Sequence, residues 1–448
     1  MRSGAPIAAA PAHLDPAESW DRATLEAFQL EQLRVQLARL ARDSAYYAPL
    51  FRQLDWNVGE LRSLADLSKL PFTTKPDYIN TLGPQAPFGK FMTVPQSEVR
   101  RMHFSSGTTS APSPQFWSER DLDRWAGLYA RHARAQGIGP GDIVQCMFSY
   151  TWFVGGLGAT AGYQRAGAMV IPAGSQDTGR QIDTLFTYGS TVLCGTPSFI
   201  THLAEEVRKR GRDPAASTVR SIMMGGEPGA SIPATRRRIE ALWGARAYDA
   251  YGCLEFQPIA GDCTAQAGPH LAEDFAYAEI VDAETGAAVA DGTPGVLVLT
   301  HLDKQAGPLV RWWTGDIVVR DSTPCSCGRT HARLVGGVRG RADDMLVVRG
   351  VNIFPSAVEQ LVRATPGLGD EYQLVINASV HDAAGFMKSI HVRVEQTDAY
   401  ADAAQLTALA AQLTQEIKQR LHVGAHVEVL PQGTLARSTH KAKRVVRE

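Results

Sequence analysis

Short apolar segments alternate with helical patterns through the middle of this 448-residue chain, and no other feature constrains the fold as much. The apolar segments cover 143–148, 168–172, 191–194 and 222–224, and helical or small-residue runs cover 155–167, 180–188 and 200–210. Strands that alternate with helices form parallel sheets covered by helices, and these sheets bind ligands beyond the carboxyl ends of their strands. The sequence therefore predicts an α/β fold with candidate loops at Thr196–Ser198, Gly225–Glu227 and Asp249–Gly252.

The flanking regions follow other patterns, which divide the chain into a large N-terminal domain and a smaller C-terminal one. Leucines recur at helical intervals over 20–42, within a helical lead-in of about 1–80 that ends in a linker at 70–76. A β-type alternation predicts a β-rich subdomain over about 276–335. We therefore expect an N-terminal domain over 1–341 and an α+β C-terminal domain over 342–448.

The charge and cysteine content exclude several classes of protein. The 45 lysines and arginines nearly balance 46 acidic residues, and no basic stripe suits a nucleic-acid backbone. No apolar run approaches the roughly 20 residues of a membrane span. Six cysteines are too few for a disulfide framework in a chain of this length. We expect a soluble protein of the reducing cytoplasm, with neither nucleic acid nor membrane as a partner.

A run of small hydroxyl residues and glycine follows the extended segment 99–104. The residues are Ser105, Ser106, Gly107, Thr108 and Thr109. Hydroxyls and free backbone N–H groups with little bulk suit a loop that wraps a phosphate chain. The alternative is an ordinary polar turn.

Three cysteines and a histidine form a second group with chemical potential. Cys263, His270, Cys325 and Cys327 supply three thiolates and an imidazole, which is enough for one tetrahedral structural zinc if the two segments meet. His331 is an alternative fourth ligand. The competing interpretation is a set of ordinary reduced cysteines, because Cys-x-Cys is tighter than the common two-residue spacer.

Nine short motifs follow one another along the chain. They are Leu70–Lys75, Ser105–Thr109, Gly155–Gly158, Thr196–Ser198, Tyr251–Glu255, Thr314–Asp316, Gly340–Asp344, Arg349–Pro355 and Lys441–Val445. In this order and spacing they resemble the adenylate-forming acyl-CoA synthetase superfamily, specifically its phenylacetate-CoA ligase branch, over nearly the whole chain. The resemblance implies an acid-thiol ligase that uses ATP, magnesium and coenzyme A and forms an acyl-adenylate, then releases AMP.

The resemblance also assigns roles to particular residues. Glu255 would bind magnesium, and Lys441 would bridge the substrate carboxylate and the α-phosphate. Asp316 and Arg341 would hold the ribose or phosphate, and Tyr251 would stack on adenine. The other residues of the implied nucleotide pocket are Gly226, Glu227, Asp249, Ala250 and Gly252, beside Ser105–Thr109.

The C-terminal domain would swing about a hinge at Asp343, with Gly350 lining the coenzyme A tunnel. Two departures from the family pattern stand out: Ser110-Ala111 replaces the usual Gly-Lys, and His440 replaces the glycine before the lysine. The loop would therefore grip phosphates mainly through backbone and hydroxyl donors, with charge neutralised by magnesium at Glu255 and by the C-terminal lysine.

An aromatic run beside glycines suggests the acyl pocket. Aromatic walls next to glycine make a short flat slot, which suits a benzoate, 2-aminobenzoate or phenylacetate better than a long acyl chain. The candidate lining residues are Tyr150, Phe153, Gly156, Gly226 and Ala250. The alternative is a packed helix that contains Trp152.

Other functions stay open at this stage. An adenylation enzyme could instead load a carrier protein, and a nucleotide-binding scaffold could keep the fold without turnover. A homodimer is one option for the oligomeric state.

Overall fold

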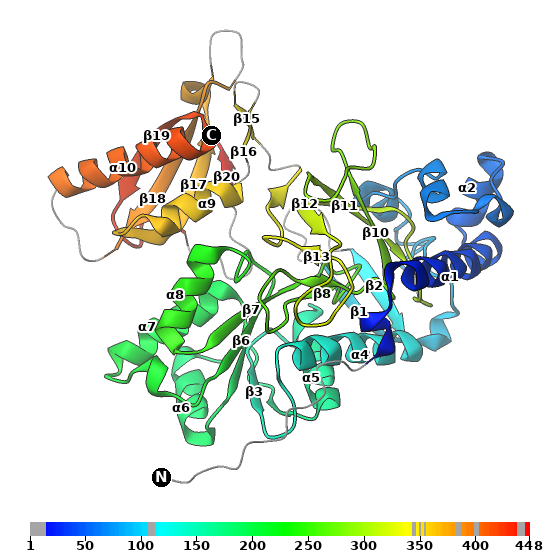
Figure 1. Ribbon diagram of the computed structural model, residues 1–448, viewed down its shortest axis with the longest axis horizontal. Coiled ribbons are helices and arrows are strands. Elements are labelled where there is room, and N and C mark those ends of the chain that lie inside the picture. The colour runs from blue at the N-terminus through cyan, green and yellow to red at the C-terminus, as the bar shows by residue number, and fades with distance from the viewer. Residues whose placement is uncertain are drawn as a thin grey trace.

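The structure is a computed structural model, and it describes residues 15–105, 113–342, 346–348, 351–353, 355–381, 387–397, 403–436 and 444–448. The chain forms a large body around one long sheet and a smaller C-terminal body with its own sheet (Figure 1). Among the described residues, no helix has the length and apolar content to cross a membrane.

The predicted α/β alternation is confirmed. Five parallel strands lie in the order β4-β3-β5-β6-β7, and helices connect them. The strands are β3 (Ile143–Cys146), β4 (Met169–Ile171), β5 (Val192–Gly195), β6 (Ser221–Met224) and β7 (Arg246–Tyr251). The helices are α4 (Glu119–Ala135), α5 (Gly155–Ala166), α6 (Thr178–Tyr188), α7 (Pro197–Lys209) and α8 (Pro233–Trp243), with the short η5 (Pro214–Ala216).

Local sequence explains where these helices begin and end. The hydroxyl of Thr196 accepts a hydrogen bond from the Phe199 amide, and Pro197 occupies the first turn of α7, where no N–H partner is needed. Gly189 ends α6 in the left-handed region, with φ of 66°, which a glycine adopts without steric conflict. The predicted loop at Thr196–Ser198 is therefore mostly the start of a helix.

The β-rich segment continues the same twelve-stranded sheet in antiparallel fashion. From β7 the order runs through β8, β9, β13, β12 and β11 to β10, and β14 pairs with β12. These strands are β8 (Ala260–Gly261), β9 (His270–Leu271), β10 (Ala276–Val281), β11 (Pro294–His301), β12 (Trp312–Asp321), β13 (Arg333–Leu334) and β14 (Gly340–Arg341). Asp249, Ala250 and Tyr251 lie inside β7, so the loop predicted there is wrong: the strand extends because Ala250 and Tyr251 pair with β8.

The N-terminal helices cover the antiparallel half of the sheet (Figure 1). Leu33, Leu37 and Leu40 of α1 share one core with Leu297 and Leu309. The elements are η1 (Pro16–Ser19), α1 (Arg22–Asp43), α2 (Tyr47–Gln53), η2 (Val58–Glu60), η3 (Leu64–Lys69), α3 (Lys75–Ile79), η4 (Gln96–Glu98), β1 (Val99–Phe104) and β2 (Pro114–Ser118).

The segment 70–76 is not a free linker, contrary to the sequence prediction. Thr73 is buried and forms a parallel bridge with Trp312. Its hydroxyl donates to the Val310 carbonyl at 2.7 Å. The segment is therefore fixed against the start of β12 by hydrogen bonds from Thr73.

The C-terminal body has a separate hydrophobic core, which includes Leu374, Val392 and Ile417. Its sheet order is β19-β18-β17-β20, beside a small β15–β16 hairpin. The elements are β15 (Leu346–Val348), β16 (Val351–Ile353), α9 (Pro355–Ala364), β17 (Leu368–Ile376), η6 (Ala378–Val380), β18 (Ser389–Gln396), α10 (Ala403–Leu421), β19 (Gly424–Leu430) and β20 (Val445–Arg447). Helix α9 packs against α8, so the two bodies touch there (Figure 1).

Candidate functional site

Three of the predicted nucleotide residues form a hydrogen-bonded group where β7, β12 and β14 meet. The Tyr251 hydroxyl donates to Asp316 Oδ2 at 2.6 Å. Arg341 Nη1 donates to Asp316 Oδ1 at 3.0 Å and to the Thr314 carbonyl at 3.1 Å. Burial raises the pKa of Tyr251 well above its usual value, so the phenol stays protonated and acts as a donor. The group fixes the Asp316 carboxylate as a negatively charged acceptor.

Glycine at position 315 is needed for this geometry. Its φ is 76°, in the left-handed region that side chains rarely adopt. A Cβ there would lie 2.6 Å from Arg341 Nη2, so the guanidinium would have to shift away from its present position. The backbone conformation thus favours glycine in the Thr314-Gly315-Asp316 motif, and the absence of a side chain lets Arg341 approach closely.

The loop after β6 is tied to its neighbours by two predicted nucleotide residues. Glu227 accepts from the Ser198 hydroxyl at 2.9 Å and from the Ser198 amide at 3.2 Å. Asp249, which is 8% exposed, accepts from the Ser231 amide at 3.0 Å. Burial raises the pKa of Asp249 to about 7. The loop that contains Gly226 is thus held at both ends by carboxylates.

Glu255 is a buried carboxylate that faces two lysines. It is 8% exposed, and burial raises its pKa, while the charges of Lys75 and Lys304 lower it. Lys304 is itself buried, with its ammonium 4.8 Å from the centre of the Trp117 ring. Glu255 thus offers a buried carboxylate oxygen, the kind of hard ligand that magnesium takes. Sequence reasoning missed Lys304, because an isolated lysine in a loop carries no pattern.

The predicted phosphate loop is described only at its base. The Ser105 amide donates to the Ser113 carbonyl at 3.1 Å, and the Ser113 amide donates to the Ser105 hydroxyl oxygen at 3.0 Å. The antiparallel pair β1–β2 thus ends in a closed neck. Ser106, Gly107, Thr108, Thr109, Asp343, Gly350 and Lys441 lie outside the described residues.

Arg444 shows which part of the C-terminal body faces the loop after β6. It donates to Glu371 at 2.9 Å, and its charge attracts Glu227, which opposes the rise that burial causes in the pKa of Glu227. Arg444 lies three residues after Lys441 in the sequence. Arg444 therefore lies on the side of the C-terminal body that faces Glu227.

The predicted acyl-pocket residues are only partly brought together. The Phe148 ring lies between two glycines of the predicted pocket region. A Cβ added to Gly155 would lie 3.4 Å from this ring, and a Cβ added to Gly225 would lie 3.8 Å from it, so the ring packs directly on both backbones. Ala250 packs against the same core as Phe148 and Tyr150. The Tyr150 hydroxyl bonds to Thr160 of α5 at 2.6 Å. Phe148 begins the aromatic run 148–153 on which the pocket prediction rests, although the expected lining residues did not include it.

The remaining members of the aromatic run are placed as follows. Gly156 packs on backbone, since a Cβ there would lie 2.5 Å from the Ser149 carbonyl oxygen. Phe153 is half-buried. Trp152 is 62% exposed beside Phe104, so the packed-helix alternative is wrong: the chain bends from 148 to 154, and α5 starts only at Gly155.

The predicted metal ligands converge from the two segments 263–270 and 325–327. Atoms able to bind a metal in Cys263, His270, Cys325 and Cys327 all lie within 4.8 Å of one another. The Cys263 and Cys325 sulfurs are 3.9 Å apart, and Cys327 Sγ lies 3.6 Å from His270 Nε2. His331 supplies its backbone carbonyl to His270 Nδ1 at 3.1 Å, and its ring is not a member of the group. The four side chains thus surround one point.

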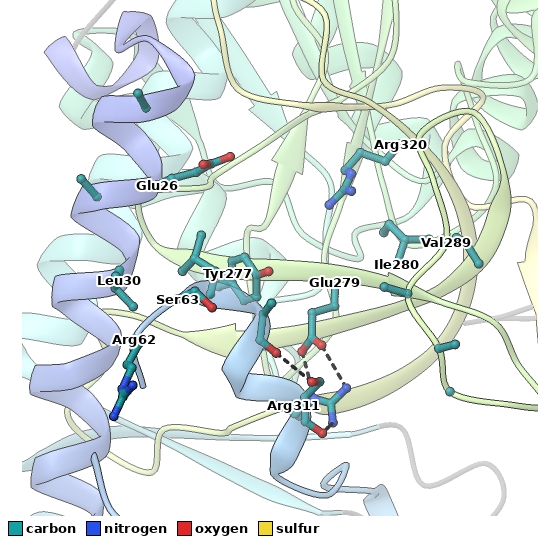
Figure 2. A pocket seen from close by; sticks show the side chains of 18 residues that line it. Glu26, Leu30, Arg62, Ser63, Tyr277, Glu279, Ile280, Val289, Arg311 and Arg320 are labelled. Carbon is teal, nitrogen blue, oxygen red and sulfur yellow. Dashed lines mark hydrogen bonds and ion pairs between the residues drawn. The ribbon is translucent and has the colours of Figure 1, made fainter. Parts of the chain in front are cut away.

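A separate cavity of about 870 Å³ lies between α1 and the antiparallel strands (Figure 2). None of the predicted site residues lines it. Its buried cation, Arg311, donates to both oxygens of Glu279 at 3.1 and 2.9 Å, as the dashed lines in Figure 2 show. The charge of Arg311 is therefore already neutralised by Glu279.

Comparison with known proteins covers the whole chain. The AMP-binding enzyme family matches residues 59–301, and the AMP-binding enzyme C-terminal domain matches residues 350–448. The chain is 36% identical to a phenylacetate-coenzyme A ligase of Aromatoleum evansii over 443 residues, which is 97% of each protein.

Solved structures of one protein, 2-hydroxyisobutyryl-CoA ligase, match the fold in two states. The postadenylation state in complex with 2-HIB-AMP is 29% identical, covers 100% of this chain and 94% of that one, and gives a TM-score of 0.91. The thioesterification state of the same ligase, at equal identity and coverage, gives 0.73. The arrangement of the two bodies is therefore closer to the postadenylation state.

Proposed function

We propose that this chain joins an aryl carboxylic acid to coenzyme A with the cleavage of ATP to AMP and pyrophosphate. The premise is that the chain belongs to the AMP-binding enzyme family and to its phenylacetate-coenzyme A ligase branch. In the first step the carboxylate attacks the α-phosphate, forming an acyl-adenylate and releasing pyrophosphate. In the second step the thiol of coenzyme A attacks the acyl carbonyl, and AMP leaves. The observation that carries the proposal is the Tyr251–Asp316–Arg341 group beside the buried Glu255 in a chain similar to such ligases over its full length.

The described residues would divide the work of the first step. Asp316, held by two donors, would accept hydrogen bonds from the ribose hydroxyls. Glu255 would bind magnesium, which screens the repulsion between carboxylate and phosphate when bound. The charges of Lys75 and Lys304 oppose the rise that burial causes in the pKa of Glu255.

Lys441 would complete the site from the C-terminal domain, which we propose spans 342–448 and swings about Asp343. Its ammonium would bridge the substrate carboxylate and the α-phosphate. Support comes from Arg444, whose charge attracts Glu227 across the two bodies. Gly350 would line the coenzyme A tunnel in the second conformation, and Ser105–Thr109 would bind the outer phosphates.

The acyl pocket would be a short aromatic slot. Phe148 lies against Gly155 and Gly225, with Ala250 packed on the same core, and Tyr150 is turned toward Thr160. A flat ring between an aromatic wall and glycine backbone fits this arrangement, whereas a long acyl chain has no comparable support. We therefore propose an aryl acid of benzoate or phenylacetate size.

Zinc at the cysteine and histidine group is the finer part of the cofactor proposal. A tetrahedral zinc places two sulfur ligands about 3.8 Å apart, and the Cys263–Cys325 separation is 3.9 Å. The His331 carbonyl requires a hydrogen on His270 Nδ1, which leaves Nε2 with a lone pair directed toward Cys327. Arg329, whose Nη1 lies 3.7 Å from Cys327 Sγ, would offset the thiolate charge.

Metal analysis of the purified protein tests the zinc proposal. We expect about one zinc per chain, lost in Cys327→Ser and retained in Cys253→Ser, because Cys253 lies outside the group. Wild-type protein without metal, or equal metal in both variants, would contradict the site.

ATP–pyrophosphate exchange over a panel of short aryl acids tests the main function. Exchange that depends on one acid, followed by thioester formation with free coenzyme A, supports the ligase. Thioester formation only on a carrier protein would support the carrier-loading alternative, and no exchange with any acid would support a nucleotide-binding scaffold. Glu255 favours the enzyme, because a scaffold that only binds a nucleotide needs no buried carboxylate for magnesium.

Two further proposals concern the setting of the enzyme. All six cysteines are free, which supports a reducing cytoplasm. The oligomeric state stays a prediction, with a homodimer as the option that light scattering on the purified protein would test.

A further inference from the structure

An arginine of the large body is paired with an aspartate of the small body where α8 meets α9. Arg238 Nη1 of α8 donates to Asp370 Oδ1 of β17. The other nitrogen of the guanidinium, Nη2, lies 3.6 Å from Glu205 of α7. Arg238 is thus held on the large body while it reaches across the boundary, and Asp370 is its partner in the small body.

The small body holds Asp370 in place from its own side. Arg363 Nη1 of α9 donates to Asp370 Oδ1 at 2.7 Å, and Arg363 also donates to Glu359 at 2.9 and 2.6 Å. Glu359 is 3% exposed and accepts from Tyr372 at 3.4 Å. The side chain of Asp370 therefore has little freedom, and a preorganised carboxylate binds an arginine with less loss of entropy than a mobile one.

The pair joins bodies whose mutual arrangement has to change during the proposed reaction. The present arrangement gives a TM-score of 0.91 with the postadenylation state of 2-hydroxyisobutyryl-CoA ligase and 0.73 with its thioesterification state. An interaction made in only one of two arrangements shifts the equilibrium toward that one. Among the described residues, the Arg238–Asp370 ion pair joins the large body to the small one.

We propose that Arg238 and Asp370 are positioning residues, forming a latch that holds the C-terminal body over the nucleotide residues for adenylation and opens before the thioester step. The inference rests on the proposed ligase function. Neither side chain touches substrate, and the latch acts by setting the fraction of molecules in which Lys441 can reach the α-phosphate. The same side chains would separate in the second arrangement and leave its chemistry unaffected.

The solvent exposure of Arg238 and Asp370 sets how strongly their ion pair can favour one arrangement of the bodies. The side chains of Arg238 and Asp370 are 37% and 25% exposed. Because solvent still screens the two charges, we take the coupling of the pair from the upper part of the range measured for surface ion pairs. That coupling corresponds to about a two- to fivefold change in the equilibrium between the two arrangements of the bodies.

The test uses the full chain with Arg238→Ala, Asp370→Ala and the double variant. Arg237→Ala is the matched control, because Arg237 lies next on the same helix and is exposed. We expect each latch variant to slow pyrophosphate exchange about two- to fivefold and to leave thioester formation from synthetic acyl-adenylate equal or faster. The double variant should be no slower than either single one, since both changes remove one interaction.

A second measurement needs no substrate and separates the latch from the proposed function. Two dyes attached at the exposed positions Tyr188 and Gln419 report the arrangement of the bodies by energy transfer. We expect the latch variants, and not Arg237→Ala, to lower the population with the present arrangement. An unchanged population, additive effects in the double variant, or parallel loss of both half-reactions would overturn the latch. If no acid supports exchange, the ligase proposal fails while the dye measurement still decides the latch.

Discussion

Removing the Tyr251 hydroxyl tests the nucleotide site at its most constrained point. In Tyr251→Phe, Asp316 loses the donor at 2.6 Å but keeps Arg341 at 3.0 Å. A hydrogen bond to a charged group contributes about 1.5–3 kcal/mol. Because Arg341 still orients the carboxylate, we take the lower end, and a loss near 1.4 kcal/mol corresponds to about tenfold in affinity.

The expected result is therefore about a tenfold weaker affinity for AMP and ATP, because Asp316 no longer faces the ribose in one fixed orientation. Calorimetric titration with AMP measures the affinity directly, and the ATP dependence of pyrophosphate release measures it during turnover. The turnover number at saturating ATP should change less than the KM for ATP.

Tyr372→Phe is the matched control for this experiment. Tyr372 is a fully buried tyrosine whose hydroxyl donates to the Pro355 carbonyl at 2.9 Å in the C-terminal body. Its loss should lower thermal stability without weakening AMP binding. Equal AMP affinity in Tyr251→Phe and wild type, or an equal loss in Tyr372→Phe, would refute the assigned role of the Tyr251–Asp316 bond.

Three further predictions follow from the site. Lys441→Ala should slow adenylate formation by about 10²–10³ while permitting thioester formation from preformed adenylate, and unchanged pyrophosphate release would contradict it. Burial raises the pKa of Asp249 from 3.8 to about 7, so its contribution to the stability of the fold is present below pH 3.8 and is lost as the pH rises through 7. In Asp249→Asn the melting temperature should therefore fall less between pH 4.5 and 8 than in wild type. Parallel curves of melting temperature against pH for the two proteins would exclude this contribution. Cys263→Ser should lose the metal and melt at lower temperature, whereas an unchanged melting temperature would show that the cluster does not stabilise the fold.

The sequence predicted elements where periodicity is strong and missed contacts between distant segments. Helix α1 and the parallel strands follow from apolar spacing, which local physics determines. The extension of β7 through Tyr251 does not follow from apolar spacing, because it depends on the pairing of Tyr251 with Ala260. The end of a strand is determined by its partner strand as much as by the propensity of its own residues. Thr73 was placed in a linker for the same reason.

The order of the motifs predicted many residues of the candidate site, but it predicted few of the hydrogen bonds between them. Tyr251 and Asp316 were both expected near the nucleotide, but their mutual hydrogen bond spans 65 positions and has no sequence signature. The same holds for Lys304, whose role depends on burial beside Trp117. The metal group could be predicted as a set because thiols and imidazole are chemically distinctive, whereas the use of the His331 carbonyl could not.

The contacts of α1 have a consequence for synthesis of the chain. Arg22 pairs with Glu273, 251 positions later, and Gln36 donates to the Lys304 carbonyl, 268 positions later. Ribosomes add about 5–20 residues per second, so α1 emerges on the order of tens of seconds before these partners exist.

During that interval Leu33, Leu37 and Leu40 have no core to enter. A nascent chain or fragment that ends before the antiparallel strands keeps an apolar helix face in water, which is the condition that favours aggregation and chaperone binding. Shortening the chain from its C-terminal end is therefore more damaging once the cut passes Leu309 and then Leu297, because the first helix loses the core partners on which it packs.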